Sequence, residues 1–141
     1  MQVLYQIPGD VRRGPLGEAE LRRREAILNT WAAAGVRVEV ADAPGGPLSI
    51  ESQVEEALCV PPMVAAVHGR PGAPDAVIVG CFGDPGVAAL RELLDCPVVG
   101  PFEASLHLAA QLGTRVGVVT VVEGVVPMLE RLVRGFGQAD V

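Results

Sequence analysis

The stretch AVIVGCFGDPGVAALRELL, residues 76–94, places a cysteine where a thiol can meet a ligand. Cys81 follows an apolar run typical of a buried strand, and the loop around it is rich in glycine. Backbone N–H groups beside glycine can approach a ligand closely, which suits an anionic or enolate-like oxygen. A helical pattern resumes near Pro85, and a helix N-terminus favours a thiolate and lowers the pKa of a thiol. Cys81 is therefore the candidate catalytic residue.

Two residues of this loop also have structural interpretations. Cys81 can equally be a small hydrophobic residue at a strand end, and the residue types alone leave both interpretations open. Asp84 could act as an acid, but its position before Pro85 predicts the N-cap of the helix that follows.

The other cysteines and both histidines are predicted to be structural or solvent-facing. Cys59 falls in a helical pattern, and Cys96 precedes a proline at the start of a strand, at the opposite edge from Cys81. His68 and His107 have no companion at metal-ligand spacing, so no metal site is predicted. The sequence contains neither GxxxxGK[ST] nor GxGxxG, which argues against a nucleotide site.

Length and composition limit the possible classes of protein. The chain has 141 residues, enough for one compact domain, and a net charge of −6, which argues against nucleic-acid binding. No segment approaches the roughly 18 uncharged apolar residues of a membrane span, and no signal peptide is recognised. Three cysteines without a CxxC pair indicate free thiols, so we expect a cytoplasmic protein.

Apolar patterns of two kinds alternate along the chain and define the elements that must position Cys81. This alternation predicts an α/β fold with a doubly wound parallel sheet. Two consecutive prolines predict that the second helical segment is kinked or divided into two short helices. The predicted strands are Val3–Ile7, Val36–Val40, Ala76–Val79, Val98–Val99 and Val116–Val121, and the predicted helices are Glu18–Ala34, Ile50–Val67, Pro85–Leu94, Glu103–Leu112 and Val125–Arg134.

Ligands of open parallel sheets bind outside the carboxyl ends of the strands. In this sequence those ends lead into the loops 8–10, 42–43, 80–86, 100–103 and 120–123. Of these loops, only 80–86 offers a nucleophile, so the expected topology selects Cys81 independently of its neighbours.

The sequence also resembles a known family. Residues 74–120, with the series GCFGDPG…LRE…PVVG…EA, closely resemble the first half of hydantoin racemases in the aspartate/glutamate racemase superfamily. The segment GPLSIESQVEEALCVPPMVAAV is also similar to that family. The resemblance implies a flavodoxin-like first lobe over residues 1–113, and the first strand and helix of an incomplete, pseudo-symmetric second lobe over residues 114–141.

The resemblance further implies a cofactor-independent racemase or epimerase that acts at a carbon next to a carbonyl, in a hydantoin or an amino acid. Two cysteines then flank a small substrate with an acidic α-carbon: one thiolate removes the α-proton, and the opposite thiol delivers a proton to the other face. Cys81 corresponds to the first of these cysteines. Phe82 and Gly83 would supply backbone donors, and Thr120 would contact substrate. The place of an Asn-Pro-Asn type loop of the family reads Ile7-Pro8-Gly9-Asp10 here, with only the proline kept, and we expect Pro8, Gly9 and Asp10 to bind substrate.

The family's second cysteine lies in a second lobe beyond the residues present here, and three interpretations stay open. The chain is a fragment or short form that is inactive alone, or it works with one cysteine as an isomerase or decarboxylase. Alternatively, two chains form a homo-oligomer in which two copies of Cys81 face each other. A different class of function also remains open, namely a non-catalytic α/β domain that binds a small carboxylate.

Overall fold

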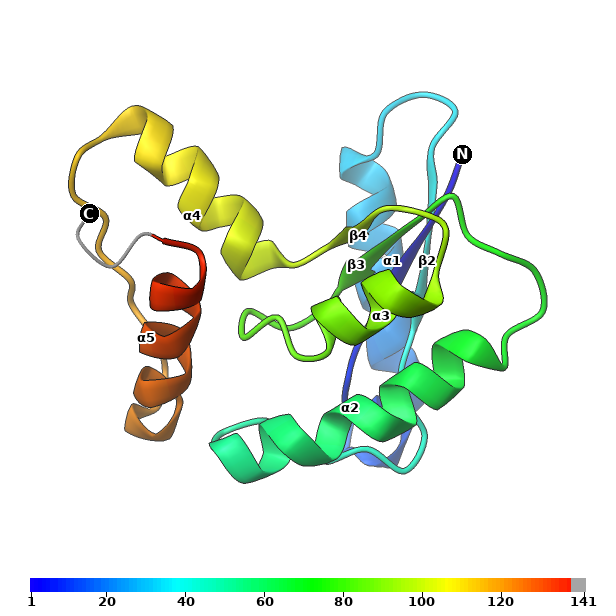
Figure 1. Cartoon of the computed structure of the whole chain (residues 1–141). Coiled ribbons are helices and arrows are strands. Elements are labelled where there is room, and N and C mark those ends of the chain that lie inside the picture. The colour runs from blue at the N-terminus through cyan, green and yellow to red at the C-terminus, as the bar shows by residue number, and fades with distance from the viewer. Residues whose placement is uncertain (138–141) are drawn as a thin grey trace.

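A four-stranded parallel sheet forms the centre of the fold. The computed structural model of the protein describes residues 1–137. Its strands are β1 (Gln2–Gln6), β2 (Arg37–Ala41), β3 (Ala76–Val79) and β4 (Val98–Val99), in the order β2-β1-β3-β4 (Figure 1). All three pairings are parallel, and Tyr5 lies opposite both Val40 and Ile78. This order is flavodoxin-like, so the predicted parallel sheet is confirmed.

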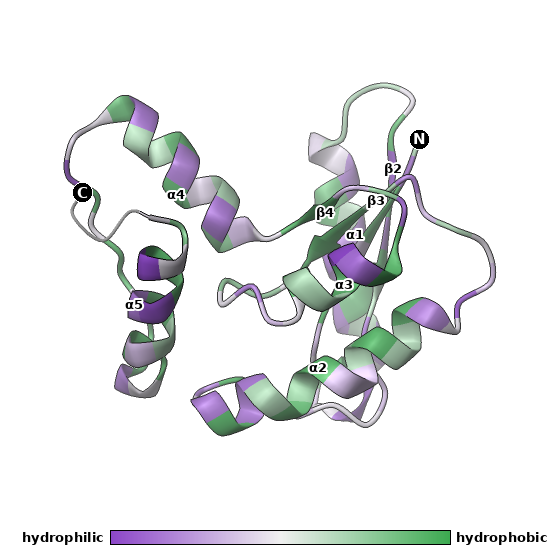
Figure 2. Ribbon diagram, in the orientation of Figure 1, coloured by the Kyte–Doolittle hydropathy of each residue, from purple (hydrophilic) through white to green (hydrophobic). Residues whose placement is uncertain are grey.

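Helices cover both faces of the sheet, as expected for a doubly wound fold. On one face, α1 (Gly17–Trp31) packs through Leu21 against Ile7 and Val40. On the other face, α2 (Gln53–His68) and α3 (Val87–Leu93) pack against Leu4 and Val77. Strands β3 and β4 are coloured as hydrophobic in Figure 2, and their residues Val77, Val79 and Val98 are buried. A 3-10 turn, η1 (Val11–Arg13), joins β1 to α1.

Helix α2 is one continuous helix, so the alternative of two short helices is wrong. Its N-cap is Ser52, whose hydroxyl accepts a hydrogen bond from Val54 N at 3.2 Å. Pro61 and Pro62 lie inside the helix and cannot donate to the carbonyls one turn earlier. Those carbonyls belong to exposed residues, where water can satisfy them. No helix within residues 1–137 has the length and apolarity needed to cross a membrane.

The C-terminal elements form a second apolar cluster. It joins Phe102 and Leu106 of α4 (Pro101–Leu112) to Met128 and Leu129 of α5 (Val126–Gly135), with η2 (Glu123–Val125) between them. Figure 1 shows α4 and α5 beside the sheet rather than over one of its faces. The predicted division between residues 113 and 114 stays a prediction; the apolar contacts group α4 with the elements that follow it.

The strand predicted at Val116–Val121 is absent, which corrects the sequence analysis. This segment is extended but has no neighbouring strand (Figure 1), and the structure assigns it no secondary structure. Val119 and Val121 are 96% and 94% exposed. A strand exists through hydrogen bonds to a neighbour, and no element within residues 1–137 lies in position to supply them.

Candidate active site

Cys81 lies just beyond the carboxyl end of β3, at the edge of the sheet selected by the sequence. The N–H of Gly80 donates to Gln6 O at 2.7 Å, so the pairing with β1 continues to this residue. The chain then turns sharply: Cys81 N donates to Val79 O at 2.9 Å, and Asp84 N donates to Cys81 O at 3.1 Å. A Cβ at Gly80 would collide with the ring of Tyr5, so glycine is needed where the strand ends.

Asp84 fixes the far end of the loop, but not in the predicted way. Its buried carboxylate accepts hydrogen bonds from Phe102 N at 2.9 Å and Glu103 N at 2.7 Å, and thus caps α4. Helix α3 begins at Val87, with Gly86 as its N-cap. The predicted capping of the helix next to Pro85 is therefore wrong, because a φ of 49° turns the Asp84 side chain away from α3. Burial raises the pKa of Asp84, although the two N–H groups oppose it.

A pocket of about 130 Å³ includes Cys81 and brings together segments far apart in the sequence. Phe82 and Gly83 lie beside the cysteine, and Thr120 comes from the extended segment before η2. The structure therefore brings together Cys81 and three of the predicted site residues. The full lining is Ile50, Cys81, Phe82, Gly83, Thr120, Val121, Val125, Met128 and Leu129.

Helix α5 forms one wall of this pocket, which sequence reasoning missed. The end of the Met128 side chain packs directly on Gly83, where a Cβ would lie 2.5 Å from Met128 Cε. An ion pair from Arg131 Nη2 to both oxygens of Glu56, at 2.9 and 2.7 Å, ties α5 to α2. The amphipathic pattern of residues 125–134 predicted a helix, but the pattern contains no information on which surface it covers.

The pKa of the Cys81 thiol is raised, contrary to the expectation from a nearby helix N-terminus. Burial is the main cause; the N–H of Gly83 lowers the pKa, while the negative charges of Asp84 and Glu56 raise it. Helix α3 begins six residues after the cysteine and not at Pro85, which weakens its influence. Cys81 is therefore a protonated thiol at neutral pH.

Cys59 is a second thiol whose burial and pKa can be compared with those of Cys81. It is fully buried, and its pKa is raised to about 12, mainly by burial and then by the charge of Cys81. Its thiol faces Glu56 O at 3.1 Å rather than the pocket. This placement agrees with its predicted structural role. All three cysteines are free, and no group of His, Cys, Asp or Glu within residues 1–137 could hold a metal ion.

A model of the family described as Asp/Glu/Hydantoin racemase matches residues 17–141. The chain belongs to this family. A hydantoin racemase of Pseudomonas sp. (strain NS671) is 44% identical over 93 residues, which are 65% of this chain and 37% of that protein. A hydantoin racemase of Paenarthrobacter aurescens is 36% identical over 110 residues, or 77% of this chain and 47% of that protein.

Solved racemases of the family share the fold. An allantoin racemase from Klebsiella pneumoniae superposes on 99% of this chain with a TM-score of 0.85 and 26% identity. An allantoin racemase from Pseudomonas fluorescens superposes on 98% with a TM-score of 0.86 and 25% identity. The present racemase-family chain spans only 55–56% of those two structures and less than half of the two hydantoin racemases.

The loop Pro8-Gly9-Asp10 lies at the end of β1 but does not line the Cys81 pocket. The Asp10 carboxylate accepts hydrogen bonds from Arg13 N at 3.3 Å and Gly45 N at 2.9 Å. Pro8 and Gly9 are buried, and a Cβ at Gly9 would lie 2.7 Å from Pro47 O. These contacts hold the loop against residues 43–47, and the predicted contact with substrate stays a prediction.

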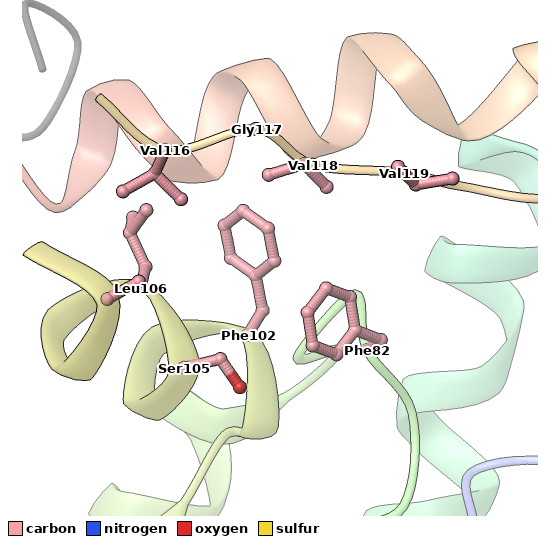
Figure 3. A pocket seen from close by; sticks show the side chains of 9 residues that line it. Phe82, Phe102, Ser105, Leu106, Val116, Gly117, Val118 and Val119 are labelled. Carbon is pink, nitrogen blue, oxygen red and sulfur yellow. The ribbon is translucent and has the colours of Figure 1, made fainter. Parts of the chain in front are cut away.

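A second, apolar pocket of about 210 Å³ adjoins the site (Figure 3). It lies between α4 and the extended segment, and Phe82 lines both pockets. The rings of Phe82 and Phe102 meet edge to face, with centroids 5.2 Å apart. Val116 points toward Leu106 and Phe102 in Figure 3. Phe82 thus separates the cysteine from an apolar space that the sequence did not predict.

Proposed function

We propose that this chain carries one of the two proton-transfer groups of a cofactor-independent racemase or epimerase. Cys81 is the group that moves the α-proton. The observation that carries the proposal is the pocket in which the Cys81 thiol lies beside Gly83 and Thr120. Membership of the racemase family supports it, as do the names of the hydantoin and allantoin racemases that the chain resembles.

The chemistry requires the minor, deprotonated form of Cys81. The thiolate removes the α-proton and becomes a thiol, while the C–H electron pair moves into the carbonyl group and gives an enolate. Because burial raises the pKa of Cys81, its thiolate is scarce at neutral pH but strongly basic. Return of a proton to the same face exchanges the α-hydrogen, whereas inversion needs an acid on the opposite face.

The lining of the pocket favours a neutral substrate. Among the described residues that line it, none has a carboxylate, guanidinium or ammonium group. A free amino acid would lose the hydration of its carboxylate and ammonium groups without a partner, and such desolvation is costly. A hydantoin has a neutral ring with an acidic α-carbon, so we propose hydantoins rather than amino acids as the substrate class.

Exchange of the α-proton in deuterated water tests the proposal. The protein is incubated with 5-substituted hydantoins and with amino acids, and exchange is followed by NMR beside Cys81→Ala and the control Cys96→Ala. We expect exchange of hydantoins that Cys81→Ala abolishes and Cys96→Ala retains, because Cys96 does not line the pocket. Absence of exchange in the folded protein would contradict the proposal.

A non-catalytic binding domain is the second candidate. It is favoured by one observation: no second thiol lines the pocket among the described residues, since Cys59 is buried away from it. Hydantoins would then raise the thermal midpoint of unfolding without exchanging their α-proton. Exchange that depends on Cys81 would exclude this candidate.

A further inference from the structure

Asp84 is a buried residue that connects the loop of Cys81 to the start of α4. Its backbone N–H donates to Cys81 O at 3.1 Å, which closes the turn that follows the thiol. The residue is 7% exposed, and its carboxylate accepts hydrogen bonds from Phe102 N at 2.9 Å and Glu103 N at 2.7 Å. The carboxylate packs directly on Gly100, where a Cβ would collide with it. One side chain thus joins the turn after the thiol to the first turn of α4.

The backbone of Asp84 has an uncommon conformation. Its φ of 49° lies in the left-handed region, and within residues 1–137 it is the only residue other than glycine with a positive φ. Aspartate and asparagine adopt this region at lower cost than most residues, and glycine adopts it freely. The hydrogen bonds of the carboxylate to α4 hold the residue there, so the loop keeps one shape through this anchor.

The negative charge of Asp84 is not balanced by a cation. In the part of the chain that the structure describes, no arginine forms an ion pair with it. Arg91 is the nearby cation, but its guanidinium donates to Val98 O and pairs with Glu103 at 2.8 Å. Both oxygens of Asp84 accept from N–H donors, which is the pattern of an ionised carboxylate. A negative charge therefore lies in the loop that carries the thiol.

The other groups around Cys81 leave Asp84 as its main charged neighbour. Helix α2 brings Glu56, whose carboxylate is paired with an arginine of α5, and the thiol of Cys59, which is neutral because its pKa is about 12. Strand β1 brings Tyr5, whose pKa is raised mainly by burial, so it is neutral below pH 10.0. The residues that line the pocket from α5 and from the segment before it have no ionisable side chain. Asp84 raises the pKa of Cys81 more than Glu56 does.

We propose that Asp84 is a positioning residue for proton transfer at Cys81: one buried carboxylate fixes the loop that carries the thiol and supplies the negative charge that keeps the proton on the sulfur. The anchor to α4 determines where the sulfur lies. The charge makes the thiolate rarer and more basic. The inference rests on the proposed function only for the use of the thiol, because the influence of Asp84 on Cys81 can be measured without a substrate.

Alkylation of Cys81 by iodoacetamide over a pH series, mapped by mass spectrometry, measures the two influences separately. The limiting rate at high pH reports access to the thiolate, and the ratio of the rate at pH 8 to this limit reports the ionised fraction. Asp84→Asn retains the shape of the side chain and tolerates the left-handed backbone, but it has no charge. It should raise the ratio about three- to tenfold and leave the limiting rate within about threefold of the native value.

Asp84→Gly removes the anchor as well as the charge, without strain in the backbone. It should raise the ratio as Asp84→Asn does, and it should also raise the limiting rate about fivefold, because the released loop opens more often. The matched control is Asp95→Asn, since Asp95 is exposed in the turn after α3; it should change neither quantity. Glu56→Gln should raise the ratio less than Asp84→Asn. Circular dichroism checks that each variant is folded.

Two results would overturn the inference. The first is a native ratio in folded Asp84→Asn or, if that variant is unfolded, in Asp84→Gly; Asp84 would then be a cap of α4 alone. The second is a larger rise in Glu56→Gln than in Asp84→Asn. The proposed function fails by a different result, the absence of α-proton exchange by the native protein, which leaves the alkylation rates unaffected. Where exchange occurs, its dependence on pH should move to lower pH in Asp84→Asn.

Discussion

At the scale of single residues, the site depends on opposing influences on one sulfur. Burial and two nearby carboxylates disfavour the thiolate of Cys81, and the N–H of Gly83 favours it. Burial dominates, so the thiol gains basicity at the cost of a small thiolate fraction. A residue of this kind works best at alkaline pH and gives up a proton readily to a stronger base such as an enolate.

Alkylation by iodoacetamide should follow the raised pKa. The thiolate is the reactive form, so the rate at Cys81 should still be rising above pH 9.0, the ordinary value for the thiol. Cys59, whose pKa is about 12, should stay unmodified until the protein unfolds. Peptide mapping by mass spectrometry assigns each rate. An inflection at Cys81 below pH 8 would contradict the effect of burial.

The raised pKa of Cys81 also determines how the stability of the protein changes with pH. The folded protein retains the Cys81 proton to a higher pH than the unfolded chain, so the unfolded chain ionises first. The contribution of the neutral thiol to the free energy of unfolding is complete below the ordinary thiol pKa. It is lost as the pH rises through the raised pKa of the folded state.

At the scale of elements, the pocket exists because α5 packs against two earlier parts of the chain, the cysteine loop and α2. Met128 of α5 packs on the glycine of the cysteine loop, and Arg131 reaches Glu56 of α2. Asp84 anchors the same loop to the start of α4. The loop is therefore held by both elements of the C-terminal cluster, and any movement of α5 changes the shape of the Cys81 pocket.

A double-mutant cycle on Arg131→Met and Glu56→Gln should measure this docking. Glu56 is largely buried and Arg131 half-exposed, so we expect a coupling of about 0.5–1 kcal/mol in the free energy of unfolding by urea. The pair Glu130–Arg134, 3.9 Å apart and exposed on α5 alone, is the matched control and should couple by less than about 0.5 kcal/mol. Equal coupling in the two cycles would mean that Arg131 does not hold α5.

At the scale of the whole molecule, two apolar regions lie side by side, and one of them is covered less fully than the other. The sheet with α1, α2 and α3 has buried apolar residues on both of its faces. The cluster of α4 and α5 is closed on one side by an extended segment whose outer face is exposed. The matched part of this chain is 55% of an allantoin racemase and 47% of a hydantoin racemase, so those relatives have further residues outside the matched part.

Hydrogen exchange followed by mass spectrometry should separate the two parts. Amides of β1 and β3 are hydrogen-bonded and buried, so they should exchange slowly at every protein concentration. Amides of residues 115–121 have no hydrogen-bond partner within the described residues, so they should exchange quickly. Slow exchange of residues 115–121 would contradict their lack of hydrogen-bond partners in the described part of the chain.

The sequence by itself determined the elements whose pattern is local. Ala76–Val79 and Val98–Val99 are strands at the predicted residues, and the helices begin and end within a few residues of their predicted limits. The parallel order also followed, because strands that alternate with helices have few other arrangements. The position of Cys81 at a carboxyl edge was a consequence of that topology and needed no knowledge of contacts.

Only the tertiary structure decided what surrounds those elements. Val116–Val121 has the composition of a strand but no neighbour, because strand formation depends on hydrogen bonds to another segment. Asp84 caps α4 instead of α3, because its backbone conformation directs the carboxylate across the loop. The raised pKa of Cys81 arises mainly from burial, and its pocket is lined in part by elements distant in the sequence, such as α5. Local pattern therefore located the thiol, while long-range packing set its protonation.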